Sequence, residues 1–259
     1  MLKQNLIKTL VSLSFFSGFM QSPVLAHVIW FDTNNGQQEL VFGHPELGRE
    51  PLTVSKFQWA NAYDGGRNLV PSINNIQGDQ IFVEPQENFA ALTAFYDNGL
   101  WRQLPNGDYE NLTREEAELI GLEYFTNYVK YTKAIYSWSN AISQPFGLPL
   151  EIVPLQNPLA LQAGETLPIQ VFLNGSLVTN PLVEYLGQTI SVSSEGIALI
   201  PIGVGGLQVI EASYNDSSAS SPGISYATTL TAAAIPEPSL LGAIGVVGLI
   251  LLSKKQLPK

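Results

Sequence analysis

The sequence predicts a mainly β protein in two parts. The first is an amino-terminal β-rich domain with one short helix. The second is an immunoglobulin-like or carboxypeptidase-regulatory-like β-sandwich, followed by a short hydrophobic helix at the carboxyl end. Two observations indicate this class. Short apolar runs alternate with turn residues along most of the chain, and no helical period occurs in the runs beyond Gly147.

The first domain is expected to span residues 27–148. Asn34, Asn35 and Gly36 form a turn signal that joins the first two apolar runs into a hairpin. The helix is expected to begin after Thr113, because Thr113 and Glu116 have the spacing of a capping box, and to end near Gly121. The strand-like runs are HVIWFD, QELVFGH, SKFQWANAY, QIFVEP, ALTAFYDN and the long EYFTNYVKYTKAIYSW.

The second domain is expected to span residues 149–235. Asn174 and Gly175 give a strong hairpin signal between two of its strands. About seven strands at this spacing are typical of a sandwich. The runs are LEIVPL, LPIQVFL, LVEYL, QTISVS, IALIPI, LQVIEASY and ISYATTLTA.

Residues 1–26 have the pattern of a secretory signal peptide. Lys3 and Lys8 give a charged start, an apolar run follows, and the segment ends in small residues at Ala26. Cleavage by signal peptidase after Ala26 would make His27 the first residue of an exported protein. That residue would then carry a free α-amine beside its imidazole.

Residues 236–259 carry a second sorting pattern: Pro236, Glu237 and Pro238, an apolar run over 239–252 and a basic tail. This order resembles the PEP-CTERM signal of exported bacterial proteins. The resemblance implies processing by an exosortase and transient membrane association through 239–252. At about 1.5 Å per residue, fourteen residues span about 21 Å, less than the roughly 30 Å hydrocarbon core, so sorting is favoured over permanent anchoring.

Charge and cysteine content narrow the possible partners. All 22 acidic residues but only seven of the 12 basic ones lie between residues 27 and 238, so that segment carries 7 minus 22, or -15. Such a surface disfavours nucleic acid and anionic lipid. The chain has no cysteine, which excludes disulfides and thiolate ligands. A bound metal would need nitrogen and oxygen ligands.

The two histidines of the chain are the candidate metal ligands. His27 would supply an α-amine and an imidazole, and His44 lies on the expected neighbouring strand. Glu46 or Asp32 could add an oxygen ligand. Three nitrogens suit nickel(II) or copper(II), and by the Irving–Williams order copper would bind more tightly.

A family resemblance points in the same direction. The order of AHVIWF, ELVFGHPE, YDNGLW, YTKAIY, LEIVPLQNPLALQAGETLPIQVFLNG and YATTL resembles an exported bacterial domain linked to nickel and cobalt uptake. The resemblance implies a periplasmic or surface protein of a Gram-negative-type bacterium that handles a transition metal, with a metal-uptake transporter as partner. It carries the ligand role over to His27 and His44.

Three functional hypotheses follow. The first is a non-enzymatic, exported nickel- or cobalt-binding protein that supports metal uptake. The second is a structural or adhesive β-sandwich protein sorted to the cell surface or exopolysaccharide. The third is a copper histidine-brace protein, such as an oxygenase. No nucleophile-elbow, Walker or dinucleotide motif occurs, so no catalytic residue is assigned.

Overall fold

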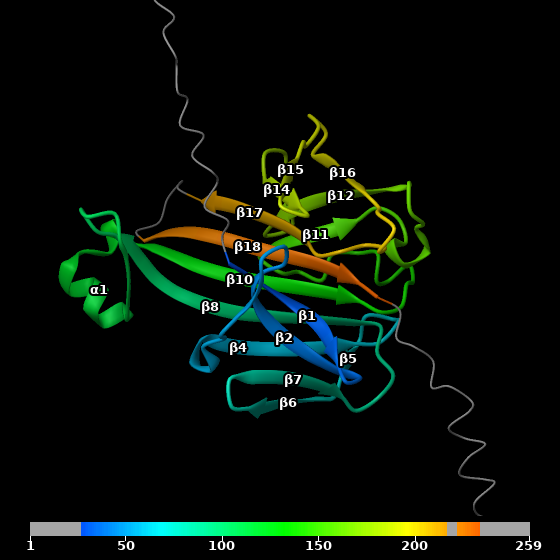
Figure 1. Cartoon of the computed structure of the whole chain (residues 1–259), viewed down its shortest axis with the longest axis horizontal. Coiled ribbons are helices and arrows are strands. Elements are labelled where there is room, and N and C mark those ends of the chain that lie inside the picture. The colour runs from blue at the N-terminus through cyan, green and yellow to red at the C-terminus, as the bar shows by residue number, and fades with distance from the viewer. Residues whose placement is uncertain (1–26, 217–221, 234–259) are drawn as a thin grey trace, which may run out of the picture.

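The computed structural model describes residues 27–216 and 222–233, which form a mainly β fold of three sheets (Figure 1). The predicted mainly β class is therefore confirmed. Both predicted sorting segments, with Ala26, the Pro236 to Pro238 motif and the expected apolar helix, lie outside the described residues. Within the described ranges, no helix is both long enough and apolar enough to cross a membrane.

The first sheet has five strands and contains the amino-terminal hairpin. The hairpin turn at Asn35 and Gly36 has φ angles of 51° and 82°. Two consecutive positive φ values are the requirement of a two-residue type I′ turn, which the Asn-Gly pair meets without strain. The predicted hairpin is thus confirmed. The order is β1 (Val28–Asn34), β2 (Gln37–His44), β7 (Gln80–Pro85) and β6 (Ser72–Gln77), and β3 (Gly48–Glu50) pairs with β2.

The second sheet has nine strands and crosses the predicted domain boundary at residue 148. Its central pair is β10 with β18, which run parallel over the ten pairs from Thr126↔Gly223 to Ile135↔Ala232. Strands from both predicted domains therefore share one hydrogen-bonded sheet. The order is β15 (Gln188–Ile190), β14 (Leu182–Tyr185), β17 (Ile210–Asp216), β18 (Gly223–Ala232), β10 (Thr126–Ile135), β8 (Ala91–Gln103), β4 (Phe57–Tyr63) and β5 (Leu69–Val70), with β9 (Tyr109–Leu112) paired to β8.

The third sheet has four strands and makes a sandwich with the carboxyl-terminal part of the nine-stranded sheet. Apolar residues of both layers, among them Ile152, Ile169 and Leu230, form one fully buried cluster. This arrangement supports the β-sandwich expected for residues 149–235. The strands are β11 (Leu150–Pro154), β12 (Thr166–Leu173), β13 (Ser176–Val178) and β16 (Ile197–Pro201).

The nine-stranded sheet is covered on both faces, as the alternation along β10 shows. Val129 and Tyr131 belong to the cluster shared with the four-stranded sheet. Ala134 belongs to a second cluster with Ile29 and Leu40 of the amino-terminal hairpin. Because successive side chains of a strand point to opposite faces, the even-numbered residues of β10 face the hairpin. Lys130 is one of them.

The α-helix found in the described ranges, α1 (Arg114–Ile120), has the expected capping box. Thr113 accepts a hydrogen bond from the Glu116 amide, and Glu116 reaches back to the Thr113 amide. The helix ends at Gly121, which has a φ of 118°. A 3-10 turn, η2 (Leu122–Tyr124), follows directly, so β10 is shorter than the predicted strand over residues 123–138. Two further 3-10 turns are η1 (Val54–Lys56) and η3 (Pro158–Ala160).

A buried ion pair joins the nine-stranded and four-stranded sheets. Lys133 Nζ on β10 lies 2.6 Å from Glu151 Oε1 on β11, and both side chains are 1% exposed. The Glu151 carboxylate also accepts hydrogen bonds from three consecutive backbone amides, those of Phe146, Gly147 and Leu148. The connection between the two halves of the chain is thus folded around one carboxylate.

Replacing Lys133 by methionine should strongly destabilise the fold, because it leaves the Glu151 charge buried without its counter-charge. We expect a loss of about 3–5 kcal/mol in the free energy of unfolding, measured by urea denaturation. Arg114→Met is the control, since Arg114 is exposed and forms only an i,i+4 pair with Glu118; its effect should stay within about 0.5 kcal/mol. Equal effects for the two variants would contradict this role of the pair.

Candidate metal centre

The end of the amino-terminal hairpin brings the two histidines together. Val28 pairs with Gly43, so His27 and His44 are the next residues of the two antiparallel strands and lie on the same face. Their ring centroids are 4.4 Å apart. The His27 ring also stacks on Phe42, with centroids 5.1 Å apart and an interplanar angle of 5°. The predicted facing of the two histidines is thus confirmed.

Glu50 completes the group from the short strand β3. Strand β3 pairs with β2 and places Glu50 opposite Phe42. Glu50 Oε2 lies 2.8 Å from His27 Nε2, and Glu50 Oε1 lies 4.0 Å from His44 Nε2. One ligand atom from each of the three residues lies within 4.8 Å of the others. Two imidazoles and a carboxylate at this spacing are a donor set suited to a divalent transition metal.

Sequence reasoning missed Glu50 because β3 has only three residues, all exposed, and so gives no apolar pattern. The available signal was the turn after His44. The Leu47 amide donates to the His44 carbonyl at 3.0 Å, and the chain then returns along β2. A tight return brings residues shortly after the turn back toward the histidines.

The surroundings of His44 favour its neutral form, which is the form that binds a metal. It is 8% exposed, and its Nδ1 is buried with no hydrogen-bond partner among the described residues. Burial and the neighbouring His27 lower the pKa of His44, although Glu46 and Glu50 act in the opposite direction. A neutral imidazole keeps the lone pair that a metal needs. The residues present therefore fit a metal ion.

The two carboxylates that the sequence offered as oxygen ligands are placed differently. Asp32 pairs with Arg49 at 2.6 Å, and the grouped ligand atoms come from His27, His44 and Glu50 rather than from Asp32 or Glu46. Both carboxylate oxygens of Glu46 are buried without a hydrogen-bond partner in the described chain. A ligand role for Glu46 stays a prediction, and Glu50 is the carboxylate that the fold brings to the histidines.

A buried lysine lies beneath the histidines. Lys130 is 2% exposed, and its Nζ donates a hydrogen bond to the His27 carbonyl oxygen. Its ammonium also lies 5.9 Å from the centre of the Phe42 ring. Burial, together with the charge of Lys56, lowers the pKa of Lys130 to about 7.

Two buried glutamates lie farther along the same face of the nine-stranded sheet. Glu184 and Glu211 are directly paired across β14 and β17, and they are 8% and 5% exposed. Burial raises the pKa of Glu211 to about 8, and the nearby Glu46 and Glu184 add to this effect. Carboxylates that lie close together and away from water cannot all be ionised without a large cost in free energy.

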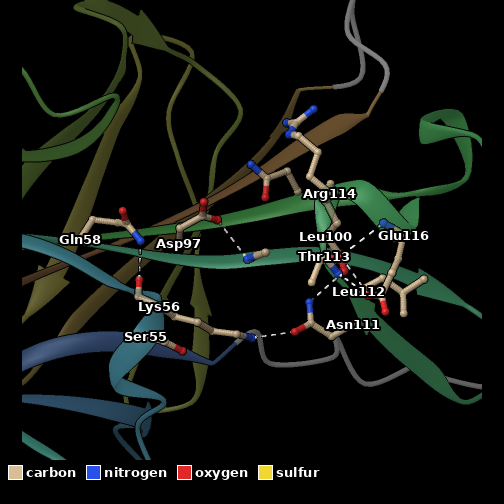
Figure 2. A pocket seen from close by; sticks show the side chains of 12 residues that line it. Ser55, Lys56, Gln58, Asp97, Leu100, Asn111, Leu112, Thr113, Arg114 and Glu116 are labelled. Carbon is tan, nitrogen blue, oxygen red and sulfur yellow. Dashed lines mark hydrogen bonds between the residues drawn. The ribbon is translucent and has the colours of Figure 1, made fainter. Parts of the chain in front are cut away.

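Two cavities of about 390 Å³ lie outside the group of His27, His44 and Glu50. One lies between the hairpin and the loops that contain Leu186 and Gln208, and Glu46 is part of its lining. The other is lined by residues of η1, β8, β9 and the start of α1, among them Lys56, Asn111 and Arg114 (Figure 2). There Lys56 Nζ donates to Asn98 and Asn111, so its donors are used in internal hydrogen bonds.

Fold and site together define a β-sandwich-type protein with a two-histidine, one-carboxylate group at the end of its amino-terminal hairpin. The chain belongs to the family described as a domain of unknown function, DUF4198, whose model matches residues 24–216. It is also similar to an uncharacterized protein of Haemophilus influenzae, with 29% identity over 155 residues. That alignment covers 59% of this chain and 64% of the relative's length.

The pKa of Glu211 predicts that stability falls as the pH rises from 5 to 7 in a chelator-treated sample. In this range the folded protein holds a proton on Glu211, whereas the carboxyl of the unfolded chain has lost it above its ordinary value of 4.5. Glu211→Gln should remove this component, which amounts to about 2 kcal/mol. Urea denaturation at pH 5, 6 and 7 measures it.

The comparison ends at pH 7 because the lowered pKa of Lys130 acts in the opposite direction above that value. The lowered pKa of His44 opposes the effect within the range in both proteins, so the difference between Glu211→Gln and the unsubstituted protein is the quantity that is compared. Glu118→Gln is the control, since the side chain of Glu118 is 54% exposed. If Glu211→Gln and the unsubstituted protein lose stability equally between pH 5 and 7, Glu211 is ionised in the folded state and the prediction fails.

Proposed function

We propose that this is an exported, non-enzymatic protein that binds nickel or cobalt and supports metal uptake at the cell surface or in the periplasm. The observation that carries the proposal is the grouping of His27, His44 and Glu50, with ligand atoms within 4.8 Å of one another. Export follows from the predicted signal peptide. A metal-uptake transporter would be the partner that receives the ion.

Cleavage after Ala26 would complete the donor set. The α-amine and imidazole of His27 can then bind one ion as a chelate, with His44 and Glu50 as further ligands. Three nitrogens and one carboxylate oxygen suit nickel(II) or cobalt(II). The same donors also accept copper(II), more tightly by the Irving–Williams order, so a copper histidine-brace protein is the second candidate.

The buried state of His44 argues against an incidental arrangement in a structural or adhesive protein. His44 Nδ1 is buried without a hydrogen-bond partner among the described residues, which costs free energy, whereas Nε2 is the ring nitrogen that lies 4.0 Å from Glu50. Placing a carboxylate within 4.0 Å of both imidazoles then compensates the charge of a bound cation.

Glu50→Gln should weaken metal binding by about tenfold or more, because it removes the anionic ligand. Glu46→Gln is the matched control: the same change, four residues earlier in the turn that precedes β3, should alter affinity by less than about threefold. Isothermal titration calorimetry with nickel, cobalt and copper measures both, on a chain shown by mass spectrometry to begin at His27. His27→Ala and His44→Ala should abolish the site.

Comparing the two substitutions also shows which of the two carboxylates binds the metal. Loss of binding in Glu46→Gln but not in Glu50→Gln would make Glu46 the oxygen ligand and contradict the assignment to Glu50. Absence of binding by the unsubstituted chain would leave the structural hypothesis. Copper binding with reductant-dependent oxidation of a polysaccharide would instead support the brace-type oxygenase.

Retaining one residue before His27 should also weaken binding. A chain that begins at Ala26 with its terminal amine acetylated has an amide instead of an amine at residue 27 and no other free terminal amine, so the chelate is lost while both imidazoles remain. We expect the affinity to fall by at least about tenfold. Equal affinities for chains that begin at Ala26 and at His27 would show that the α-amine is no ligand.

A further inference from the structure

Residue 27 lies just outside the backbone ladder that holds its strand. The first pair of β1 with β2 is Val28↔Gly43, so His27 precedes the ladder. Its contacts with Phe42, His44 and Glu50 are made by the imidazole. Chain ends fray unless something holds them. A terminal chelate needs the main chain of residue 27 to be held as firmly as its ring.

Lys130 holds the main chain of residue 27 in place. Its Nζ donates to the His27 carbonyl oxygen across 103 positions of sequence. The lysine lies on β10, whose residue 130 is paired with Tyr96 on one side and Ala227 on the other. The side chain is 2% exposed and passes over Phe42, so it has little freedom to move. The hydrogen bond therefore starts from a rigid point.

The orientation of this carbonyl fixes the peptide plane between residues 27 and 28. Fixing that plane limits the directions in which the Cα of His27 can present its amine. Groups that orient a ligand without touching the metal commonly change metal affinity by about 10- to 100-fold when they are replaced. Resting on the proposed metal function, we propose that Lys130 is a positioning residue that holds the amino-terminal histidine in its chelating geometry.

A purely structural role is the competing explanation, and the molecule contains a matched case. Thr229 Oγ1 donates to the Ile29 carbonyl oxygen at 2.7 Å. This is the same kind of buried tie from the nine-stranded sheet to β1, two residues farther along. It fastens the strand without reaching residue 27. Thr229→Val therefore removes a comparable tie to β1, together with the bond between Thr229 and Thr132, while leaving the terminal residue held.

The test is nickel titration of the chain that begins at His27, with Lys130→Met and Thr229→Val. Lys130→Met should bind nickel about 10- to 100-fold more weakly. Thr229→Val should lower the melting temperature but keep the affinity within about threefold. Lys130→Arg, which keeps a long cationic donor, should recover part of the loss.

A second measurement reports on the α-amine itself. Bound nickel should protect the terminal amine of the unsubstituted protein from reductive methylation, detected by mass spectrometry of the first peptide. In Lys130→Met the amine should stay reactive at nickel concentrations that saturate the imidazoles. If Lys130 only stabilised the fold, its replacement would weaken amine protection and imidazole binding together.

The outcomes distinguish this inference from the proposed function. If the unsubstituted chain does not bind nickel, the proposed function fails and the positioning role fails with it. If it binds, and Lys130→Met shows the same affinity and amine protection, the positioning role alone is overturned. Should Lys130→Met not fold, Lys130→Gln, which also removes the ammonium, is judged by the same two measurements.

Discussion

The parallel pairing of β10 with β18 is the constraint on which the rest of the structure depends. Ten consecutive residue pairs join strands whose first residues are 97 positions apart, Thr126 and Gly223. Parallel strands need a long crossover connection, and here that connection contains all four strands of the four-stranded sheet. One face of this pair covers the core shared with the four-stranded sheet. The other face supports the amino-terminal hairpin.

The candidate metal centre is built on that second face. Lys130 of β10 holds the His27 carbonyl, and Thr229 of β18 holds the Ile29 carbonyl two residues later. Thr229 Oγ1 also accepts a hydrogen bond from Thr132 Oγ1 at 2.7 Å, because its own proton is donated to Ile29, and this bond links the two strands beneath the hairpin. The ligands thus come from a surface hairpin, but their positions are set by the central strands of the molecule. Sites supported by sheet strands keep their geometry better than sites formed by loops alone.

Local signals predicted the parts of this arrangement that depend on neighbouring residues. The Asn35-Gly36 turn fixes the register of β1 and β2, and that register alone places His27 beside His44. The capping box at Thr113 is equally local. Glu50 could not be identified because β3 has three exposed residues and no apolar period.

The pairing of strands that are distant in the sequence could not be predicted, for a different reason. The apolar pattern of a strand shows which face is buried but not which distant strand lies beside it. The prediction of two domains on either side of residue 148 therefore did not foresee a sheet with strands from both segments. The role of Lys130 was hidden in the same way, since its partner lies 103 positions away. A lysine within TNYVKYTKAI gives no sign by itself that it is buried.

The tie between Thr229 and Ile29 has a consequence for the order of events during folding. It spans 200 positions and joins the first described strand to the last. Contacts between such distant segments form late, because closing a long loop costs entropy before any contact repays it. In a chain that is made from its amino terminus, His27 is present long before β18 is available to pair. The two histidines therefore reach their final support only when the last strand has been inserted, so assembly of the ligand group marks the completion of the fold.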